Sequence, residues 1–367
     1  MRRPPRVAFA YLITATAGLA FTIAAAPPPQ KAKAPDFSEA AVNGTDTPTL
    51  AKGASGPAVL RAQVMLDRAG FSPGVLDGHY GMLMERALRA YQQAKGLPVT
   101  GKLDTATWAA LPREPNPPLV RLAISPRDMA GPFVPSIPKD MGAQAKLPGL
   151  FYTSVEEALA EKFHTTPEFL KQINPNADFR KPGAVILVPN VRGVARLQPG
   201  TSPQITASAA PARLTWDVML NQLSVPPNLP KAAKVVVDKS DTSVRALDAQ
   251  GRTIAFFPAT IGSEHDPLPI GNWKIKGTAK LPPFHYNPDL FWDAEADDGK
   301  AVLPPGPNSP VGVVWIDLSK PHYGIHGTPN PATISRTESH GCIRLANWDA
   351  AKLAQMVAPN TPAILQE

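Results

Sequence analysis

A single cysteine lies among histidines near the end of this 367-residue chain. The stretch HYGIHGTPNPATISRTESHGCIRLANWD holds Cys342, with His340 two positions before it and His326 sixteen positions before it. A cysteine nucleophile needs a base that takes its proton, a third group that orients the base, and N–H donors for the oxyanion. The types and spacing of these residues therefore fit nucleophilic catalysis by a thiol.

A core cysteine beside two structural histidines is the alternative interpretation, because cysteine is often buried. Structural thiols usually lie in apolar runs, whereas Cys342 is surrounded by Ser339, His340, Gly341 and Arg344. A cationic neighbourhood is expected to lower the pKa of the thiol, which is typical of reactive cysteines. We therefore favour the catalytic interpretation.

The elements around these residues must bring them together. His326 ends the strand-like run YGIHG, and Cys342 lies just before a helix predicted at 347–357 with Asn347 as its N-cap. A strand and a nearby turn can meet in space, and Gly341 lets the backbone come close to a substrate. The seven histidines show no H-E-x-x-H or similar spacing, and no phosphate-cradling glycine loop is present, so we predict neither metal nor cofactor.

The first 26 residues are typical of a targeting segment. Three arginines precede an uncharged apolar run at 7–26, which is about 20 residues long and could span a bilayer. The segment is therefore either a cleaved signal peptide or an uncleaved anchor, and contact with a membrane is expected only in the second case. Export to the periplasm or cell wall is expected in both. A lone cysteine in an exported protein is an inert thiol, an intermolecular link or a nucleophile.

Composition bounds the organisation and the partners. The chain has 44 prolines, which bunch between apolar stretches and predict several small units joined by stiff linkers. The formal net charge of +7 is mildly basic and consistent with work near an acidic polymer or a membrane surface. The absence of a basic stripe with interleaved aromatic residues argues against nucleic acid as a partner.

Periodicity divides the chain into seven segments. The spacing of apolar residues predicts three short helices first, then a small strand–helix–helix–strand module, and finally short β-branched runs with at least one helix. In order, we expect a targeting segment (1–26), a linker (27–48), a three-helix domain (49–112), a proline-rich linker (113–146), the small module (147–191), a second linker (192–232) and a mostly β domain (233–367).

Three resemblances follow from these stretches. IHGTPNP and TESHGCIRLANWDA resemble the signature of the L,D-transpeptidase catalytic domain, also called YkuD-like, and the likeness spans residues 234–367. Residues 49–111 resemble the peptidoglycan-binding-like three-helix domain, and FHTTPEFLKQINPNA is similar to the core of the lysin motif, a glycan-binding module. The resemblances imply a multidomain fold, in which a mostly-β L,D-transpeptidase domain follows a three-helix domain and a small α+β module.

The catalytic resemblance also implies a mechanism. Cys342 attacks the carbonyl between diaminopimelate and the terminal D-alanine of a tetrapeptide stem, and an amine acceptor resolves the resulting thioester. His326 acts as base and then as acid, and the Gly327 carbonyl orients its imidazole. The backbone N–H groups of Gly341 and Cys342 are the oxyanion donors that we expect.

Three further residues are assigned to the site on this resemblance. His340 lines it, with a structural hydrogen bond as the alternative role. Ser339 and Arg344 are expected to bind substrate, and a structural ion pair is the equal alternative for Arg344.

The expected partner is peptidoglycan, both its glycan strands and its stem peptides. The acceptor that resolves the thioester could be a second stem peptide, a lipoprotein, a free D-amino acid or water, and the sequence does not distinguish them. An L,D-carboxypeptidase or other thiol hydrolase and an inactive wall-binding scaffold are the alternative functions. Because 49–191 contributes nothing to the catalytic signature, we expect its removal to leave turnover of small soluble fragments nearly unchanged.

Overall fold

The computed structural model describes residues 35–112, 115–193, 213–292, 294 and 299–367. The targeting segment predicted at 1–26 lies outside the described residues. Within them, no helix combines the length and the apolar character needed to cross a membrane. The residues from Pro35 to Glu367 form one compact unit, so the predicted domains touch one another.

The N-terminal part is helical, as predicted. Its helices are α1 (Glu39–Val42), α2 (Pro57–Arg68), α3 (Met82–Ala94) and α4 (Thr105–Ala110). Asp104 caps α4, because its side chain accepts a hydrogen bond from the Thr107 N–H. Tyr91 and Trp108 are buried in the core that α2, α3 and α4 share, which we call the three-helix unit.

The middle part is a strand–helix–helix–strand unit, which we call the βααβ unit. It consists of β1 (Leu119–Ala123), α7 (Val155–Lys162), α8 (Pro167–Ile173) and β2 (Val185–Pro189), and the two strands pair antiparallel. Two short helices, α5 (Pro126–Met129) and α6 (Met141–Gln144), lie between β1 and α7.

The opening strand of this unit comes from the range that the sequence suggested as a linker, 113–146. Its partner strand lies about 60 residues further along the chain, so no local pattern reveals the pairing. The second expected linker, 192–232, likewise contains a helix, α9 (Trp216–Gln222). Both segments are therefore part of the folded structure where they are described.

The C-terminal domain is mostly β, as predicted, and contains one mixed sheet of nine strands. The strand order is β5-β4-β3-β13-β7-β10-β11-β12-β6. The strands are β3 (Lys234–Asp238), β4 (Ser243–Leu247), β5 (Thr253–Pro258), β6 (Thr260–Ile261), β7 (Gly271–Lys280), β10 (Val314–Leu318), β11 (Gly324–His326), β12 (Ile343–Arg344) and β13 (Pro362–Gln366).

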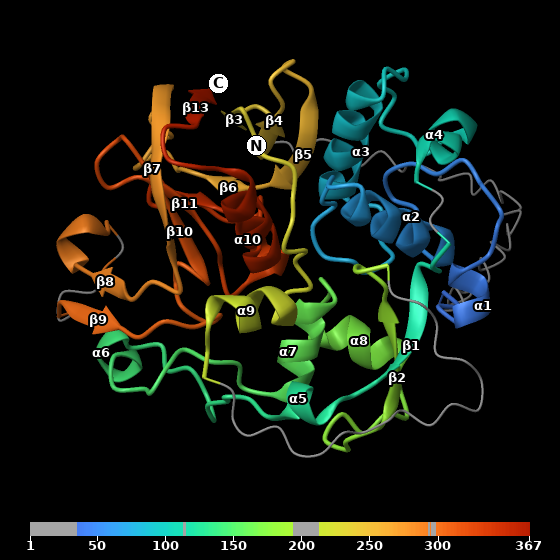
Figure 1. Ribbon diagram of the computed structural model, residues 1–367, viewed down its shortest axis with the longest axis horizontal. Helices are drawn as coiled ribbons and strands as arrows, with labels where there is room; N and C mark the ends of the chain where they lie inside the picture. Colours follow the sequence, from blue (N-terminus) through green and yellow to red (C-terminus); the bar gives the residue numbers. More distant parts are fainter. Residues whose placement is uncertain (1–34, 113–114, 194–212, 293, 295–298) are drawn as a thin grey trace, which may run out of the picture. The chain divides into compact units, whose positions relative to one another are not determined.

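Three further elements complete this domain. Helix α10 (Asn347–Met356) packs against β10 and β11 (Figure 1). Strands β8 (Phe284–Tyr286) and β9 (Ala301–Leu303) form a separate antiparallel pair. Short 3-10 helices cover Pro288–Leu290 and Pro331–Thr333.

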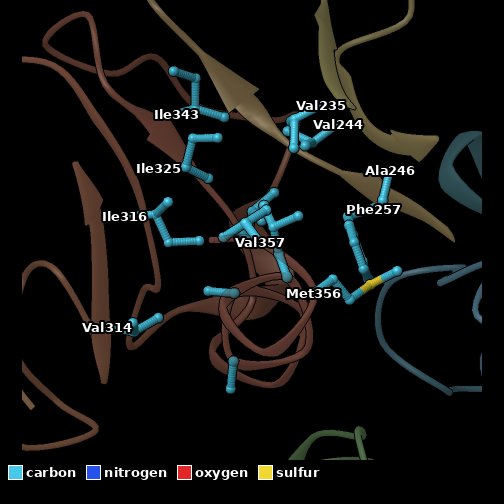
Figure 2. Close-up of a cluster of buried hydrophobic side chains, with 14 of the residues drawn as sticks. Val235, Val244, Ala246, Phe257, Val314, Ile316, Ile325, Ile343, Met356 and Val357 are labelled. Atoms are coloured by element: carbon cyan, nitrogen blue, oxygen red, sulfur yellow. The ribbon is translucent and has the colours of Figure 1, made fainter. Parts of the chain in front are cut away.

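The core of this domain fixes which side chains face away from it. Ile316, Ile325 and Ile343 are fully buried and come from the neighbouring strands β10, β11 and β12. Figure 2 shows them in one cluster with Met356 and Val357 from the end of α10. Because side chains alternate along a strand, their immediate neighbours point to the opposite face.

The three-helix unit covers one edge of the large sheet. The Ser72 N–H donates to the Phe256 carbonyl and the Phe256 N–H donates to the Gly70 carbonyl, both at 2.9 Å. The Phe256 ring is fully buried in the core of the three-helix unit. This contact pairs backbone groups of β5 that an open edge strand would leave exposed.

A buried polar cluster joins all three parts at α10. Lys352 of α10 lies 2.8 Å from Asp67 of α2, and the His164 imidazole lies 3.1 Å from the same carboxylate. The His164 ring also stacks on Trp348 at 4.9 Å between centroids. Burial acts to raise the pKa of Asp67, but Lys352 and His164 together hold it below its usual range. The parts are thus tied by specific buried contacts, not strung along stiff linkers.

Candidate active site

Strand alternation places four side chains on the face of the sheet opposite the core. In the parallel register of β11 and β12, Ile325 pairs with Ile343 and His326 pairs with Arg344. Cys342 directly precedes Ile343, so its side chain shares the face of Arg344 and His326. The antiparallel register of β10 and β11 puts Trp315 opposite His326, and the two rings stack at 5.4 Å.

These side chains line one cavity of about 380 Å³. It brings together Cys342, His326, His340 and Arg344, as the sequence suggested. The other lining residues are Asp266, Phe284, His285, Leu290, Phe291, Pro310, Val311, Trp315, His322 and Tyr323.

His326 is held as a neutral base. Its Nδ1 lies 2.7 Å from the Gly327 carbonyl oxygen, which can only accept, so Nδ1 carries the proton and Nε2 keeps its lone pair. Burial and the nearby charge of Arg344 lower the pKa of His326 to about 4, although the Gly327 hydrogen bond opposes this shift. The imidazole can therefore accept a proton at neutral pH.

Cys342 differs from the sequence expectation. Burial raises the pKa of its thiol, and the charge of Asp266 adds to this effect. The Arg344 charge and a hydrogen bond from the Gly324 backbone act in the opposite direction but do not prevail. The expected lowering of the thiol pKa by cationic neighbours is therefore wrong, because burial outweighs them. At neutral pH the resting pair is a thiol and a neutral imidazole.

Ser339 and His340 lie in the turn that leads to Cys342. The buried Ser339 hydroxyl donates to the Cys342 carbonyl at 2.6 Å, and its N–H donates to the Gly262 carbonyl at 3.1 Å. The His340 ring lies edge-on to Phe291, with 4.7 Å between centroids. Ser339 thus closes the turn, whereas His340 contacts the chain that follows β8.

Gly341 has a backbone that other residues rarely adopt. Its φ is +85°, and a Cβ at this position would lie 2.7 Å from the Tyr323 ring. Only glycine accommodates both the left-handed conformation and the close approach of the ring. The turn before Cys342 therefore depends on this residue type.

Arg344 borders two hollows. It lines the cavity of Cys342 and also a wider hollow whose wall includes Glu157 and Asn330. Its guanidinium donates to the Glu338 carbonyl at 3.1 Å.

Asn347 supports the loop that orients His326. Helix α10 begins at Asn347, but its N-cap is Ala346, so the predicted capping role is wrong. The amide oxygen of Asn347 instead accepts from the Val313 N–H at 3.1 Å, and its Nδ2 donates to the Pro307 carbonyl at 3.0 Å. The amide is thus engaged by Val313 and Pro307 and does not cap the helix.

Residues 284–291 form part of the cavity wall. Phe284 and Phe291 line the cavity, and both pack in a cluster with Leu150 and Met141 from outside the C-terminal domain. This part of the wall is thus packed against residues that precede the helices of the βααβ unit.

Several residues that line the cavity were not predicted from the sequence. Trp315 alternates with the buried Val314 and Ile316, so a period-two pattern could have placed it on the site face. Asp266 and Tyr323 lie in loops, where no periodicity signals a position. Among the described residues, no group of three or more His, Cys, Asp or Glu side chains could hold a metal ion.

Comparison with known families agrees with this geometry. Residues 232–365 match the family described as L,D-transpeptidase catalytic domain, and residues 55–111 match the family described as putative peptidoglycan binding domain. A putative L,D-transpeptidase YkuD from Bacillus licheniformis is 26% identical over 207 residues, which cover 56% of this chain and 89% of the relative. The Bacillus subtilis protein of the same description is 53% identical over 55 residues, which cover 15% of this chain and 34% of that relative.

Solved structures of L,D-transpeptidases are similar to this chain only at low sequence identity. An L,D-transpeptidase from Xylanimonas cellulosilytica is 14% identical, with 88% of this chain and 99% of that chain covered and a TM-score of 0.33. L,D-transpeptidase 3 from Mycobacterium tuberculosis with a faropenem-derived adduct is 18% identical, with 36% and 59% covered and a TM-score of 0.30. This chain thus spans about three fifths of the latter, and at such TM-scores the likeness adds no weight.

Proposed function

Because this chain carries a catalytic domain of the L,D-transpeptidase family and a peptidoglycan-binding domain, we propose that it is a peptidoglycan L,D-transpeptidase with Cys342 as nucleophile. The observation that supports this most is the shared face of β11 and β12. It places Cys342 and His326 in one cavity, with Nε2 of the imidazole left as an acceptor. The substrate is the tetrapeptide stem of peptidoglycan.

The first half of the reaction forms a thioester. Cys342 Sγ attacks the carbonyl that joins diaminopimelate to the terminal D-alanine, while His326 Nε2 takes the thiol proton. The C–N bond then breaks, and His326 returns this proton to the leaving amine of D-alanine. Because the resting pair is neutral, proton transfer accompanies attack instead of preceding it.

The second half transfers the acyl group. An acceptor amine attacks the thioester carbonyl and gives its proton to His326, and the thiol of Cys342 leaves and regains that proton. A second stem peptide as acceptor gives a cross-link, and a lipoprotein amine gives protein anchoring. The enzyme would work outside the cytoplasm, where this polymer lies.

The remaining site residues take supporting roles in this proposal. The N–H groups of Gly341 and Cys342 stabilise the oxyanion, and Gly327 orients the base through its carbonyl. Arg344 binds a substrate carboxylate, and His340 lines the donor cavity. We assign Ser339 to shaping the turn, because its hydroxyl is engaged by the Cys342 carbonyl.

Mass spectrometry of tetrapeptide-bearing wall fragments tests this function. Incubation with the protein should release D-alanine and produce new dimers with the mass of a cross-link. Tripeptides without dimers would instead identify an L,D-carboxypeptidase. Unchanged fragments, with the protein folded, would contradict an enzymatic role and favour a wall-binding scaffold.

A further inference from the structure

We propose that Glu161 of the βααβ unit is a positioning residue for His326, acting through Asn347. The docked unit would then be part of the catalytic apparatus, and not only an attachment to the cell wall. This inference rests on the proposed function, because it concerns the base of that reaction.

The first link is a buried hydrogen bond between two parts of the protein. Asn347 Nδ2 of α10 donates to Glu161 Oε1 of α7 at 2.8 Å. Both side chains are buried, at 0% and 7% exposure. The second carboxylate oxygen of Glu161 accepts from the Tyr152 hydroxyl at 2.6 Å. The carboxylate is therefore held from two sides, and it fixes the orientation of the Asn347 amide.

The second link is the contact of this amide with the loop of the base. A Cβ at Gly327 would lie 2.1 Å from Asn347 Oδ1, and a Cβ at Gly312 would lie 2.0 Å from the same atom. The amide thus lies directly against the backbone of both glycines. The Gly327 carbonyl is the acceptor for His326 Nδ1–H. A shift of Asn347 must therefore move the group that orients the imidazole.

A second set of contacts holds the neighbouring wall of the cavity. The Leu150 N–H donates to the Pro305 carbonyl at 3.1 Å, and the Asn308 N–H donates to the Leu150 carbonyl at 2.9 Å. Asn308 Nδ2 also donates to Glu157 Oε1 at 2.8 Å. The loop at 305–312 carries Pro310 and Val311, which line the cavity of Cys342. The same unit therefore supports two walls of the site.

The charge of Glu161 is sensitive to pH near neutrality. Burial raises its pKa to about 7, the nearby charge of Glu157 adds to this effect, and the donors Tyr152 and Asn347 oppose it. The ionised carboxylate is the stronger acceptor for both donors. Protonation would weaken the hold on Asn347, so the geometry of His326 should loosen as the pH falls through 7.

The experiment compares Glu161→Gln and Glu161→Leu with wild type in the full chain. The probes are a carbapenem, whose acylation of Cys342 needs a positioned base, and iodoacetamide, which alkylates the thiol directly. Acylation should be followed from pH 5 to 8 and separated into an apparent affinity and a maximal rate. Thermal unfolding reports whether each variant folds.

Asp349→Asn is the matched control. Asp349 is also a buried carboxyl on α10 whose pKa burial raises to about 7, and it accepts from Ser72 of another unit. Within the described part of the chain, Asp349 accepts a hydrogen bond from Ser72 and lies 3.9 Å from the Lys352 ammonium, and it has no hydrogen bond to the loop of His326. Loss of a buried carboxyl between units is thus common to both variants, whereas contact with Asn347 is not.

We expect Glu161→Leu to lower the maximal acylation rate about 10- to 100-fold, with the apparent affinity and the alkylation rate little changed. Glu161→Gln should keep more activity, because its amide oxygen can still accept from Asn347, and should lose the step near pH 7. Asp349→Asn should retain both the rate and the step.

Two outcomes overturn the inference. One is acylation by the Glu161 variants at the wild-type rate with the wild-type pH profile, and the other is an equal loss in Asp349→Asn. If Glu161→Leu does not fold, the nearly isosteric Glu161→Gln decides through its pH profile. Failure of wild type to be acylated at all would instead contradict the proposed function.

Discussion

His326 and Arg344 lie opposite each other in the parallel register of β11 and β12, so imidazole and guanidinium share one face of the sheet. The charge of Arg344 helps to lower the pKa of His326 to about 4 and acts to lower the pKa of Cys342. One residue therefore influences the protonation of both reacting groups. Burial is the larger cause of the lowered pKa of His326, and Arg344 adds to it, whereas for the thiol the charge of Arg344 opposes burial.

Replacement of Arg344 by Gln should raise the pKa of the Cys342 thiol further. The alkylation rate of Cys342 by iodoacetamide, measured against pH, should then have a midpoint above that of wild type. Arg344→Lys, which keeps the charge, is the control and should shift the midpoint less. A midpoint that falls on loss of the guanidinium would contradict the electrostatic role assigned to Arg344.

His326→Ala should affect acylation far more than the thiol pKa. Above about pH 4 the imidazole is neutral, so its removal takes away no positive charge that stabilises the thiolate. The alkylation midpoint should stay close to the wild-type value, while carbapenem acylation at pH 7 should fall by about 10²–10⁴.

His340→Ala is the control for this variant and should lose less acylation. An alkylation midpoint that rises strongly in His326→Ala would show that a thiolate–imidazolium pair exists before attack. A larger loss of acylation in His340→Ala would mean that the base is the other histidine.

Cys342→Ala should remove the carbapenem adduct without loss of the fold. The described chain offers no second thiol, because Cys342 is the only cysteine in the sequence. Intact-protein mass spectrometry should show one adduct on wild type and none on the variant, with unchanged circular dichroism. A retained adduct would mean that another side chain is the nucleophile.

Gly341→Ala, compared with a control glycine, should show whether activity depends on the turn before Cys342 and not only on backbone strain. Its φ of +85° makes a side chain cost about 1–2 kcal/mol of unfolding free energy, and the new Cβ would also displace Tyr323. Gly251→Ala is a matched control, with φ of +76° and no atom within 4 Å of the added Cβ. Both variants should lose stability in denaturant unfolding, but only Gly341→Ala should lose acylation. Equal acylation in the two variants would mean that the turn before Cys342 tolerates a side chain.

The unfolding free energy should fall as pH rises from about 4 to about 7. Burial raises the pKa of Glu161 and of Asp349 to about 7, whereas in the unfolded chain both lie near 4. Between these values the folded state binds more protons, so each group can contribute a slope of up to roughly 1.4 kcal/mol per pH unit. The lowered pKa of His326 has the opposite sign between about pH 4 and 6.5 and offsets about one of these two slopes there, so a net fall remains. The lowered pKa of Asp67 also has the opposite sign but acts only below about pH 4.

Denaturant unfolding at several pH values measures this slope. Asp349→Asn should flatten it, whereas Asp178→Asn, at an exposed position, should leave it unchanged. Stability that rises between pH 4 and 7 in wild type would show that these carboxyls are ionised throughout that window.

Removal of the N-terminal parts should reduce both stability and acylation, whereas the sequence suggested that turnover would stay nearly unchanged. A protein of residues 213–367 would expose Phe256 and Trp348, which pack on the removed units, at roughly 2 kcal/mol for each side chain. It would also lose the contact of Glu161 with Asn347. We expect a lower melting temperature and slower carbapenem acylation than in full length. Unchanged acylation would restore the expectation that these units serve only for attachment.

Much of this fold could be predicted from the sequence, because the patterns that indicate its helices and strands are local. The alternation of β-branched residues predicted the β domain, and the spacing of apolar residues predicted the helices of the N-terminal part. The motif around Cys342 and His326 predicted the pair that the cavity contains. These patterns lie within a few residues of one another, where spacing carries the information.

The contacts between units could not be predicted from the sequence in this way. Glu161 and Asn347 are separated by 186 residues, and Asp67 and Lys352 by 285. In the sequence, these polar residues look like ordinary exposed positions on helices. The thiol pKa was also mispredicted, because neighbouring charges can be counted along a sequence but burial cannot.

The many roles of α10 limit how this protein can change over evolutionary time. Within two turns, Asn347, Trp348, Asp349 and Lys352 contact groups from the βααβ unit, the three-helix unit or both. A gene fusion that transplanted the catalytic domain alone would place an unmatched tryptophan and lysine on its surface. Substitution on either side of this helix requires a compensating change in a distant part of the gene. We therefore expect the three units to be inherited together, as a block that recombination seldom separates.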